Sequence, residues 1–385
     1  MERQPLRGND IREYNEKLVL NLIHKNEGIS QSQIAKITGL KAPTVLRIFS
    51  KLEEQGYIRQ CAADKEKINK KGRKPVFFCV SPGIFNAIGI DFWSKYASVV
   101  AVDFCGNVLF KKVYHLKDGI KASETTLILK KLVIEAIEKS HIKKDRLLGI
   151  GIGAPGRVNI KDGSIISYAR IKGMANFPLK KELEKSIGVP VFVHNNSSVI
   201  ALSEYRYGIA KNIDSLLLIL IRSGVGGALI DQGKIFTSRN STALEIGHMS
   251  IDINGKKCTC GRKGCLEAYI SEDSIISELQ KITAFTSLDE ITDKMVTPDF
   301  KKVIEKQSYY LFEGIKNLYQ IFAPQGILII TRSMPVSTLL GNFINKRLKD
   351  DQLSKDNNLV ILSDKYDPVL AGSGATDLVF DSFFA

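Results

Sequence analysis

A chain of 385 residues is longer than one ordinary domain, and its 44% hydrophobic and 25% charged residues are the proportions of a globular protein with a substantial core. The longest apolar run covers only residues 216–221 and the N-terminus has no apolar signal core, so we expect neither a membrane span nor secretion and predict a cytoplasmic protein. The formal net charge is +14, and six cysteines are too few for a disulfide scaffold.

The excess positive charge is concentrated at the N-terminal end. Residues 1–82 contain 16 Lys and Arg against 9 Asp and Glu, whereas the other 303 residues contain 39 against 32, so each part carries a net charge of +7. A basic excess at one end of a chain is typical of a protein that binds a polyanion. A solvated basic surface has the same composition, so the order of the residues must decide between the two.

The N-terminal segment predicts a group of short helices. Residues 15–26 have apolar side chains at helical spacing. Ser30 is a suitable N-cap for a second helix, and Gly39 suits the left-handed backbone of a tight turn. A third helix is predicted over residues 42–55, with Pro43 in its first turn.

Residues 33–45 resemble a helix-turn-helix motif. Small Ala35 lets the two helices approach, Gly39 makes the corner between them, and Val45 packs the second helix against the first. The early turns of such a second helix lie against base edges in the major groove of DNA. We therefore expect the following residues to face DNA: Lys41, Ala42, Thr44, Arg47 and Lys51. Of these, Arg47 is best suited to read guanine.

A β-hairpin wing is predicted after the third helix. Residues 56–60 and 75–80 have the pattern of two strands, and the polar loop between them holds five lysines. Arg73 and Lys74, in a Gly-Arg-Lys-Pro sequence, are typical of an extended basic element that enters a minor groove. Residues 1–82 are thus predicted to form a winged helix-turn-helix DNA-binding domain; a helical subdomain for protein contacts is the alternative.

The rest of the chain alternates apolar strands with helical segments. Strands separated by a turn are expected within residues 87–109, followed by a helix over 124–140 and a buried strand over 147–151. Apolar runs at residues 216–220 and 326–330 continue the alternation. This order of elements indicates an α/β sheet architecture.

A cluster of one histidine and three cysteines is the most specific motif in the chain. The side chains of His248, Cys258, Cys260 and Cys265 supply one imidazole and three thiolates, a donor set that suits tetrahedral Zn²⁺. Because all four positions are filled by the protein, the predicted zinc is structural and not catalytic. Reduced cysteines without a metal are the alternative, which a glycine-rich turn of this kind disfavours.

Several motifs resemble the ROK family of bacterial sugar kinases and repressors. They are Gly-His followed by Cys-x-Cys-Gly-x-x-Gly-Cys-x-Glu, Gly153-Ala-Pro-Gly-Arg-Val, Gly224-Val-Gly-Gly-Ala-Leu-Ile and Ala371-Gly-Ser-Gly-Ala. The resemblance runs from about Ile88 to the C-terminus. The preceding winged helix is similar to that of the repressor branch, which includes repressors of xylose operons and of N-acetylglucosamine use.

The resemblance implies an actin-like or hexokinase-like α/β fold in which two lobes enclose a cleft. On this basis residues 83–200 are expected to form the first lobe, completed by a C-terminal helix over about 369–385. Residues 201–368 are expected to form the second lobe, which carries the zinc knuckle.

The resemblance also places the kinase machinery, and three of its parts differ here. Asn196 stands where the family has its catalytic aspartate, and a carboxamide cannot accept a proton. Asp91-Phe-Trp-Ser-Lys replaces a glycine-containing phosphate loop, and Thr331-Arg-Ser replaces paired glycines near the adenosine site. We therefore expect no enzymatic activity; an ATP-dependent sugar kinase is the alternative.

The residues that resemble the family's sugar-binding set are better retained. They are Asn176, Asn195, Glu245, His248 and Glu267. Carboxylate and amide groups of this kind form directional hydrogen bonds with sugar hydroxyls. His248 is expected to use one ring nitrogen for zinc and the other for the sugar. Alternatively, these groups form hydrogen bonds with one another in a cleft that binds no ligand, and a protein partner takes the place of the sugar in controlling the protein.

Together these features predict a homodimeric transcriptional repressor of a carbohydrate operon, with xylose among the candidate sugars. A two-fold symmetric dimer, or a higher oligomer, would place recognition helices on a palindromic double-stranded DNA operator. A sugar or sugar phosphate in the cleft would modulate DNA binding. An activator in place of a repressor remains the further alternative.

Overall fold

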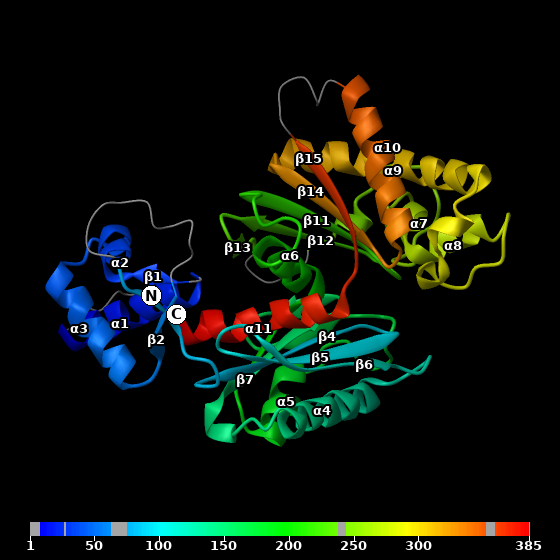
Figure 1. Ribbon diagram of the computed structural model, residues 1–385. Helices are drawn as coiled ribbons and strands as arrows, with labels where there is room; N and C mark the ends of the chain where they lie inside the picture. Colours follow the sequence, from blue (N-terminus) through cyan, green and yellow to red (C-terminus); the bar gives the residue numbers. More distant parts are fainter. Residues whose placement is uncertain (1–7, 27, 63–74, 238–243, 352–358, 385) are drawn as a thin grey trace.

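The computed structural model describes residues 8–26, 28–62, 75–237, 244–351 and 359–384. A small N-terminal domain lies at one side of two larger lobes, and the C-terminal helix runs between the lobes toward that domain (Figure 1). The elements of the N-terminal domain are α1 (Gly8–His24), β1 (Ile29–Ser30), α2 (Gln31–Thr38), α3 (Ala42–Glu54), β2 (Ile58–Cys61) and β3 (Phe77–Val80). Its sheet has the order β1-β3-β2.

Local side-chain signals fix the helices of this domain. Ser30 forms a capping box at the start of α2: its hydroxyl accepts from the backbone N–H of Gln33 at 3.3 Å, and the Gln33 side chain accepts from the Ser30 N–H at 2.9 Å. Gly39 follows α2 with a φ of 70°, which glycine adopts without strain. The predicted second and third helices are confirmed, and α1 begins seven residues before the predicted start at residue 15, at Gly8.

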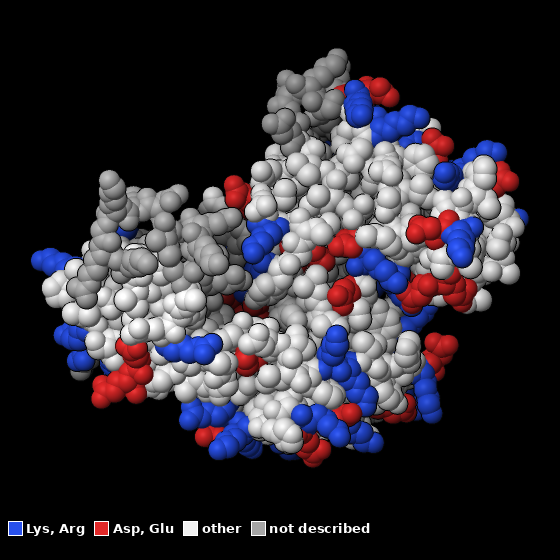
Figure 2. All heavy atoms as spheres, viewed as in Figure 1, with Lys and Arg blue, Asp and Glu red and all other residues white. Residues whose placement is uncertain are grey.

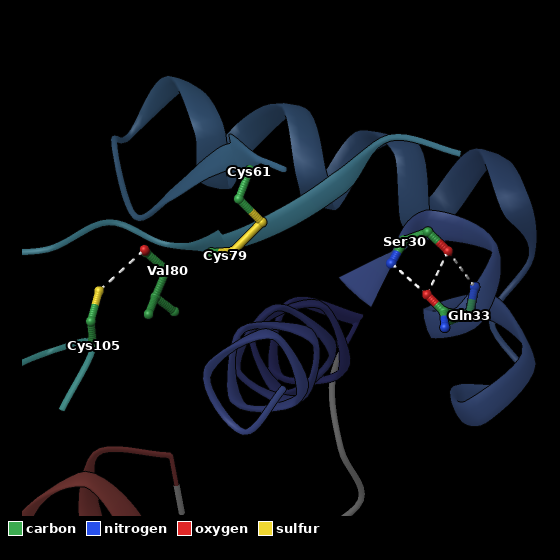
Figure 3. Close-up of a disulfide and its surroundings, with 6 residues drawn as sticks. All are labelled: Ser30, Gln33, Cys61, Cys79, Val80 and Cys105. Carbon is green, nitrogen blue, oxygen red and sulfur yellow. Dashed lines mark hydrogen bonds between the residues drawn. A yellow bond between two sulfur atoms is a disulfide. The ribbon is translucent and has the colours of Figure 1, made fainter. Parts of the chain in front are cut away.

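The predicted wing strands are also present. β2 and β3 pair antiparallel, from Ile58 opposite Val80 to Cys61 opposite Phe77. The predicted DNA contacts Arg73 and Lys74 lie outside the described residues. A disulfide between Cys61 and Cys79 joins the two strands (Figure 3). It was not predicted, because the clustered cysteines near His248 indicated metal binding and not disulfides.

The first lobe is built on a five-stranded sheet of order β10-β7-β4-β5-β6. Its strands are β4 (Asn86–Phe92), β5 (Tyr96–Asp103), β6 (Val108–His115), β7 (Leu147–Ala154) and β10 (Val191–Asn195), and β8 (Arg157–Asn159) pairs with β9 (Ser164–Ser167) beside it. α4 (Ala122–Lys139) and α5 (Leu179–Ile187) cover one face of the sheet, and α11 (Pro368–Phe384) covers the other (Figure 1). The fully buried strands β4 and β5 form the centre of this core.

The second lobe contains another five-stranded sheet, of order β13-β12-β11-β14-β15. Its strands are β11 (Ser215–Ile221), β12 (Val225–Asp231), β13 (Lys234–Ile235), β14 (Gly326–Thr331) and β15 (Val360–Lys365). Its helices are α7 (Glu267–Ile270), α8 (Glu272–Leu279), α9 (Pro298–Phe322) and α10 (Met334–Asp350). Short 3-10 turns are η2 (Lys144–Arg146) in the first lobe and η3 (Ile246–His248), η4 (Leu288–Glu290) and η5 (Asp293–Met295) in the second.

Helix α6 (Asn196–Arg206) lies between the lobes, where it contacts both β7 of the first sheet and β11 and β12 of the second. The predicted division of the lobes at residue 200 falls inside this helix. Within the part of the chain that is described, no helix combines the length and the hydropathy needed to cross a bilayer.

The C-terminal helix lies directly on the strands of the first sheet. A Cβ atom at Gly89 in β4 would overlap the backbone oxygen of Gly372, and one at Gly151 in β7 would overlap that of Ala375. The two glycines therefore set the distance between α11 and the sheet. α11 also contacts β5 of the same sheet.

The disulfide gives a stability prediction. The bond closes a loop with a sequence separation of 18, so its formation should stabilise the winged domain by about 3 kcal/mol, because it restricts the unfolded chain. Urea unfolding of the oxidised protein should show a lower midpoint after addition of dithiothreitol. The Cys61→Ser variant should unfold at the lower urea midpoint with or without the reductant. A wild-type midpoint that stays the same after addition of dithiothreitol would contradict the prediction.

Candidate ligand cavity and DNA-binding surface

The predicted recognition helix α3 presents its early turns to solvent. Lys41, Ala42 and Arg47 are exposed and Thr44 is half-buried, whereas Val45 packs inward. Lys and Arg side chains stand on the outer edge of the domain, away from the lobes (Figure 2). This side of α3 therefore has the free donors that a major-groove surface needs.

Lys51 differs from the other predicted DNA contacts. Its ammonium forms an ion pair of 2.5 Å with Glu16 on α1. The pair ties α3 to α1, so Lys51 contributes to the internal packing of the domain as well as to its positive charge.

A cavity of about 550 Å³ opens between the two lobes. Its walls come from the loop after β7, the start of α6, the loop between β11 and β12, and the cysteine-rich segment. The residues that line it include Trp93, Arg157, Tyr168, Arg170, Asn195, Asn196, Ser197, Arg222, Glu245, His248, Glu267 and Asp273. Four of the five predicted sugar-binding residues are thus brought together. Asn176 is exposed and does not line this cavity.

Asn195 holds the start of α6 against the first lobe. Its Oδ1 accepts from the N–H of Ser197 at 2.9 Å and so caps the helix, and its Nδ2 donates to the backbone oxygen of Gly156 at 2.7 Å. One side chain therefore links the helix, the Gly156 loop and the cavity wall.

The carboxylates of the cavity lie on the second lobe. Glu267 accepts from the N–H of Val225 at 3.0 Å through Oε2. Burial raises the pKa of Glu245, and the nearby His248 and Arg157 partly offset this increase. Two acceptor-rich side chains at the same wall suit a ligand that carries several hydroxyl groups.

Arginines on the cavity wall were not anticipated from the sequence. Arg157 is exposed on β8. Arg170 follows β9, pairs with Asp273 at 3.2 Å and donates to the backbone oxygen of Ser223. Because Asp273 and Ser223 belong to the second lobe, Arg170 also joins the lobes at the mouth of the cavity. Arg157 belongs to the Gly153-Ala-Pro-Gly-Arg-Val motif, but the sequence did not assign it to the cavity; Arg170 lies in none of the motifs.

The four predicted metal ligands converge beside the cavity. The ligand atoms of His248, Cys258, Cys260 and Cys265 all lie within 4.8 Å of one another. The Nδ1 of His248 lies 3.8 Å from the sulfur of Cys258, and the sulfurs of Cys260 and Cys265 are 3.7 Å apart. Hydrogen bonds from the backbone and side chain of Arg262 lower the pKa of Cys260, which favours the thiolate that binds metals. The four side chains are close enough together that they could hold one metal ion.

Comparison with known proteins decides the family. The model of the ROK family matches residues 87–380, and a model of winged helix-turn-helix DNA-binding domains matches residues 12–59. The chain belongs to the ROK family. Its fold is the ROK fold preceded by a winged helix-turn-helix domain, as the motifs predicted.

Relatives of this ROK protein include two curated xylose repressors. One, from Caldicellulosiruptor bescii, is 28% identical over 83% of this chain and 83% of its own length. The other, from Bacillus subtilis strain 168, is 26% identical over 97% of this chain and 96% of its own. A crystal structure of a ROK family transcriptional regulator, described as a homologue of the E. coli MLC protein, has a TM-score of 0.81 at 22% identity and covers 97% of this chain and 98% of its own.

A ROK glucokinase from Streptomyces griseus, solved with glucose and AMPPNP, also shares the fold of the lobes. Its TM-score is 0.66 at 22% identity, covering 76% of this chain and 98% of its own. Kinases and regulators of the family therefore have the same lobes, and the side chains in the cleft must distinguish them.

Beside the cavity, the cleft of this ROK protein is filled by buried charges. Asp91 at the end of β4 pairs with Arg222 of the second lobe at 3.4 Å and accepts from the hydroxyl of Tyr366 at 2.6 Å. Both Asp91 and Arg222 are buried. Burial raises the pKa of Asp91, and the Arg222 guanidinium opposes that shift.

Trp93 and Arg332 complete this filled region. The Trp93 ring lies 5.2 Å from the guanidinium carbons of both Arg222 and Arg332. Arg332 in turn pairs with buried Glu272 at 2.9 Å. The aromatic ring from the first lobe thus lies against arginines of the second.

The Arg332–Glu272 pair gives a prediction. Arg332→Leu should destabilise the protein by about 3–5 kcal/mol, because it removes the cation that pairs with the buried Glu272 carboxylate and with Asp289. Adding Glu272→Gln should recover part of the loss. Trp93 is the sole tryptophan, so its fluorescence during urea unfolding reports on this cluster directly.

The matched control is Lys302→Leu, which breaks an exposed ion pair of 3.0 Å with Asp299. Exposed pairs are worth about 0–1 kcal/mol, so this variant should unfold close to the wild type. Equal losses from Arg332→Leu and Lys302→Leu would contradict the assigned role of the buried pair.

Proposed function

We propose that this ROK family protein is a sugar-responsive transcriptional repressor, acting as a cytoplasmic homodimer on a palindromic operator. The observation that carries the proposal is the presence, in one chain, of an exposed recognition helix and an inter-lobe cavity lined by Asn195, Glu245 and Glu267, with the neighbouring part of the cleft filled by side chains. The named relatives are repressors, which supports the same direction of regulation.

On the DNA side, the exposed early turns of α3 support contacts from Lys41, Thr44 and Arg47 to the major groove. Arg47 donates in the bidentate geometry that matches guanine. Lys41 is also placed to reach a phosphate, and Arg73 and Lys74, which lie outside the described residues, are proposed for phosphates or the minor groove; positive charge there contributes to affinity.

On the ligand side, the acceptors Glu245 and Glu267 and the amide of Asn195 suit vicinal hydroxyl groups of a sugar. A pentose such as D-xylose, or a hexose, fits a cavity of about 550 Å³. The relatives' names make xylose the first sugar to test. Asn176 is left out of the proposed contact set because it does not line the cavity.

The residues at the positions where the family resemblance puts the kinase machinery support a protein that does not transfer phosphate. Asn196 lines the cavity where the family's base would stand, and its amide cannot accept a proton from a sugar hydroxyl. Trp93 and its arginine neighbours occupy the adjoining region. We infer a binding protein without kinase activity.

The donor set of His248, Cys258, Cys260 and Cys265 fits structural Zn²⁺. Bound there, zinc would fix the segment that carries His248 and Glu267 to the cavity wall. The side chain of His248 then serves both sites, since its Nδ1 faces the cysteines while the residue also lines the cavity.

The central experiment separates the two binding activities. Duplexes selected from a random library by the purified protein provide the operator, and its affinity is measured with and without D-xylose or N-acetylglucosamine. We expect one sugar to weaken operator binding by about 5–150-fold, the usual range of allosteric coupling. No effect of any sugar would exclude the small-molecule version of the proposal.

Variants should divide the two activities. Arg47→Ala should weaken operator binding by about 1–3 kcal/mol and leave sugar affinity unchanged. Glu245→Gln should weaken sugar binding and leave operator affinity unchanged. Lys131→Ala, which removes an exposed charge from α4, controls for net charge and should change neither affinity. ATP-dependent phosphorylation of a sugar by the wild-type protein would contradict the proposal that it has no kinase activity.

Removal of a metal ligand gives a separate prediction. Cys260→Ser should reduce the zinc content measured by atomic emission and lower the thermal stability of the second lobe, because ligand loss at a structural site removes folding free energy. Cys105→Ser is the control, since that exposed cysteine lies outside the cluster. A Cys260→Ser protein with full zinc content and unchanged stability would contradict the ligand assignment.

A further inference from the structure

Two helices connect the cavity to the DNA-binding domain. The first, α6, begins at the cavity wall, where Asn195, Asn196 and Ser197 line the hollow. Asn195 caps α6 and binds the backbone of Gly156. A ligand that displaces this end of α6 therefore acts on the whole helix, because an α-helix of eleven residues moves as a unit.

The far end of α6 is tied to α11 by a buried ion pair. Arg206, the last residue of α6, contacts Asp377 at 3.0 Å and Asp381 at 2.8 Å. The hydroxyl of Tyr207 donates to Asp377 at 2.7 Å. Asp377 is 1% exposed, so its ion pair with Arg206 is largely shielded from water, which strengthens the attraction between the two charges.

The packing between α6 and α11 leaves no room for sliding. A Cβ atom at Gly374 of α11 would lie 2.7 Å from the backbone oxygen of Val199 and 2.6 Å from the Cβ of Ser203. The two helices are thus in backbone contact near their middle and joined by charges at the end. Displacement of one must displace the other.

The C-terminal end of α11 packs on the DNA-binding domain. The ring of His24, the last residue of α1, lies 5.1 Å from that of Phe380 and 5.3 Å from that of Phe384. It also lies 4.8 Å from Phe104 of the first lobe. Burial, with nearby Arg206, lowers the pKa of His24 to about 4, so the ring is neutral at physiological pH and packs as an aromatic group.

The route continues to the recognition helix. α1 is joined to α3 by the ion pair of Glu16 and Lys51, and the two helices share a core with Val19, Ile23 and Phe49. Figure 1 shows α6 and α11 side by side between the lobes, with the C-terminus of α11 against the N-terminal domain. Each step from the cavity to α3 is a direct packing or ionic contact.

We propose that Arg206 and Asp377 are the coupling residues that transmit the state of the cavity, through α6 and α11, to the orientation of the DNA-binding domain. This inference rests on the proposed function, since it assigns the connection between its two sites. The residues touch neither ligand nor DNA; they are positioning residues whose role is to make α6 and α11 move together.

The test uses reciprocity: if the cavity affects DNA binding, DNA binding must affect the cavity end of α6. Hydrogen–deuterium exchange of the full-length protein is measured with and without the selected operator duplex. In the wild type, operator should change exchange in α1 and also in residues 200–206 of α6. In the double variant Arg206→Met/Asp377→Asn, the change should remain in α1 and disappear from α6.

A second readout measures the coupling directly. The ratio of operator Kd values with and without saturating D-xylose should be about 5-fold or more in the wild type and near 1 in the double variant. Sugar affinity and sugar-free operator affinity should stay close to wild type. A role limited to stability would lower the melting temperature and leave this ratio unchanged.

The matched control is Lys112→Met/Glu135→Gln, which removes a 2.7 Å ion pair between β6 and α4, away from the route. This control variant should keep the exchange response of α6 and the ratio of operator Kd values. Arg206→Lys, which retains the positive charge, should keep part of both. A double variant with the wild-type α6 response, or a wild type that binds operator without any α6 response, would overturn the relay. A protein that binds no duplex at all would instead overturn the proposed function.

Discussion

The direct contact of α11 with the first sheet is the constraint on which the rest of the structure depends. Gly89 and Gly151 have no side chains, so the backbone of the helix lies against β4 and β7. α11 is consequently packed on the sheet through backbone contacts and not through adjustable side chains. It can serve as a common support for α6 on one side and for the DNA-binding domain at its end.

The cleft between the lobes is divided into a filled part and a hollow part by its buried charges. Taking Asp91 and Arg222 out of water is costly, and their ion pair together with the Tyr366 hydroxyl offsets that cost. Arg332 and Glu272 form a second buried ion pair, and the Arg332 guanidinium also lies over the Trp93 ring. Because Asp91 and Trp93 come from the first lobe and the arginines from the second, this region holds the lobes together while the adjacent cavity stays open to a ligand.

Local signals explain what the sequence predicted well. The capping residue Ser30, the turn at Gly39 and the spacing to Val45 lie within one short segment, and the predicted helices were found with small shifts at their ends. The metal ligands from His248 to Cys265 are likewise close in sequence, so their convergence needs only tight turns.

Pairings between distant segments were beyond the reach of sequence patterns. Trp93 meets Arg332, and Arg206 meets Asp377, only after both sheets have formed. An arginine after a buried strand has no periodicity that distinguishes a buried ion pair from a surface charge. Asn176 is a similar case: the family resemblance suggested it for a sugar, but it does not line the cavity.

The chemistry of Asn195 explains how a small ligand could act over such a distance. Its amide already makes two hydrogen bonds, one that caps α6 and one to Gly156, so a sugar hydroxyl at this side chain must share or replace them. Either outcome changes the forces on the first turn of α6. A ligand at Asn195 would therefore act on α6 directly, and in the proposed relay α11 moves with α6 and carries the effect to the DNA-binding domain.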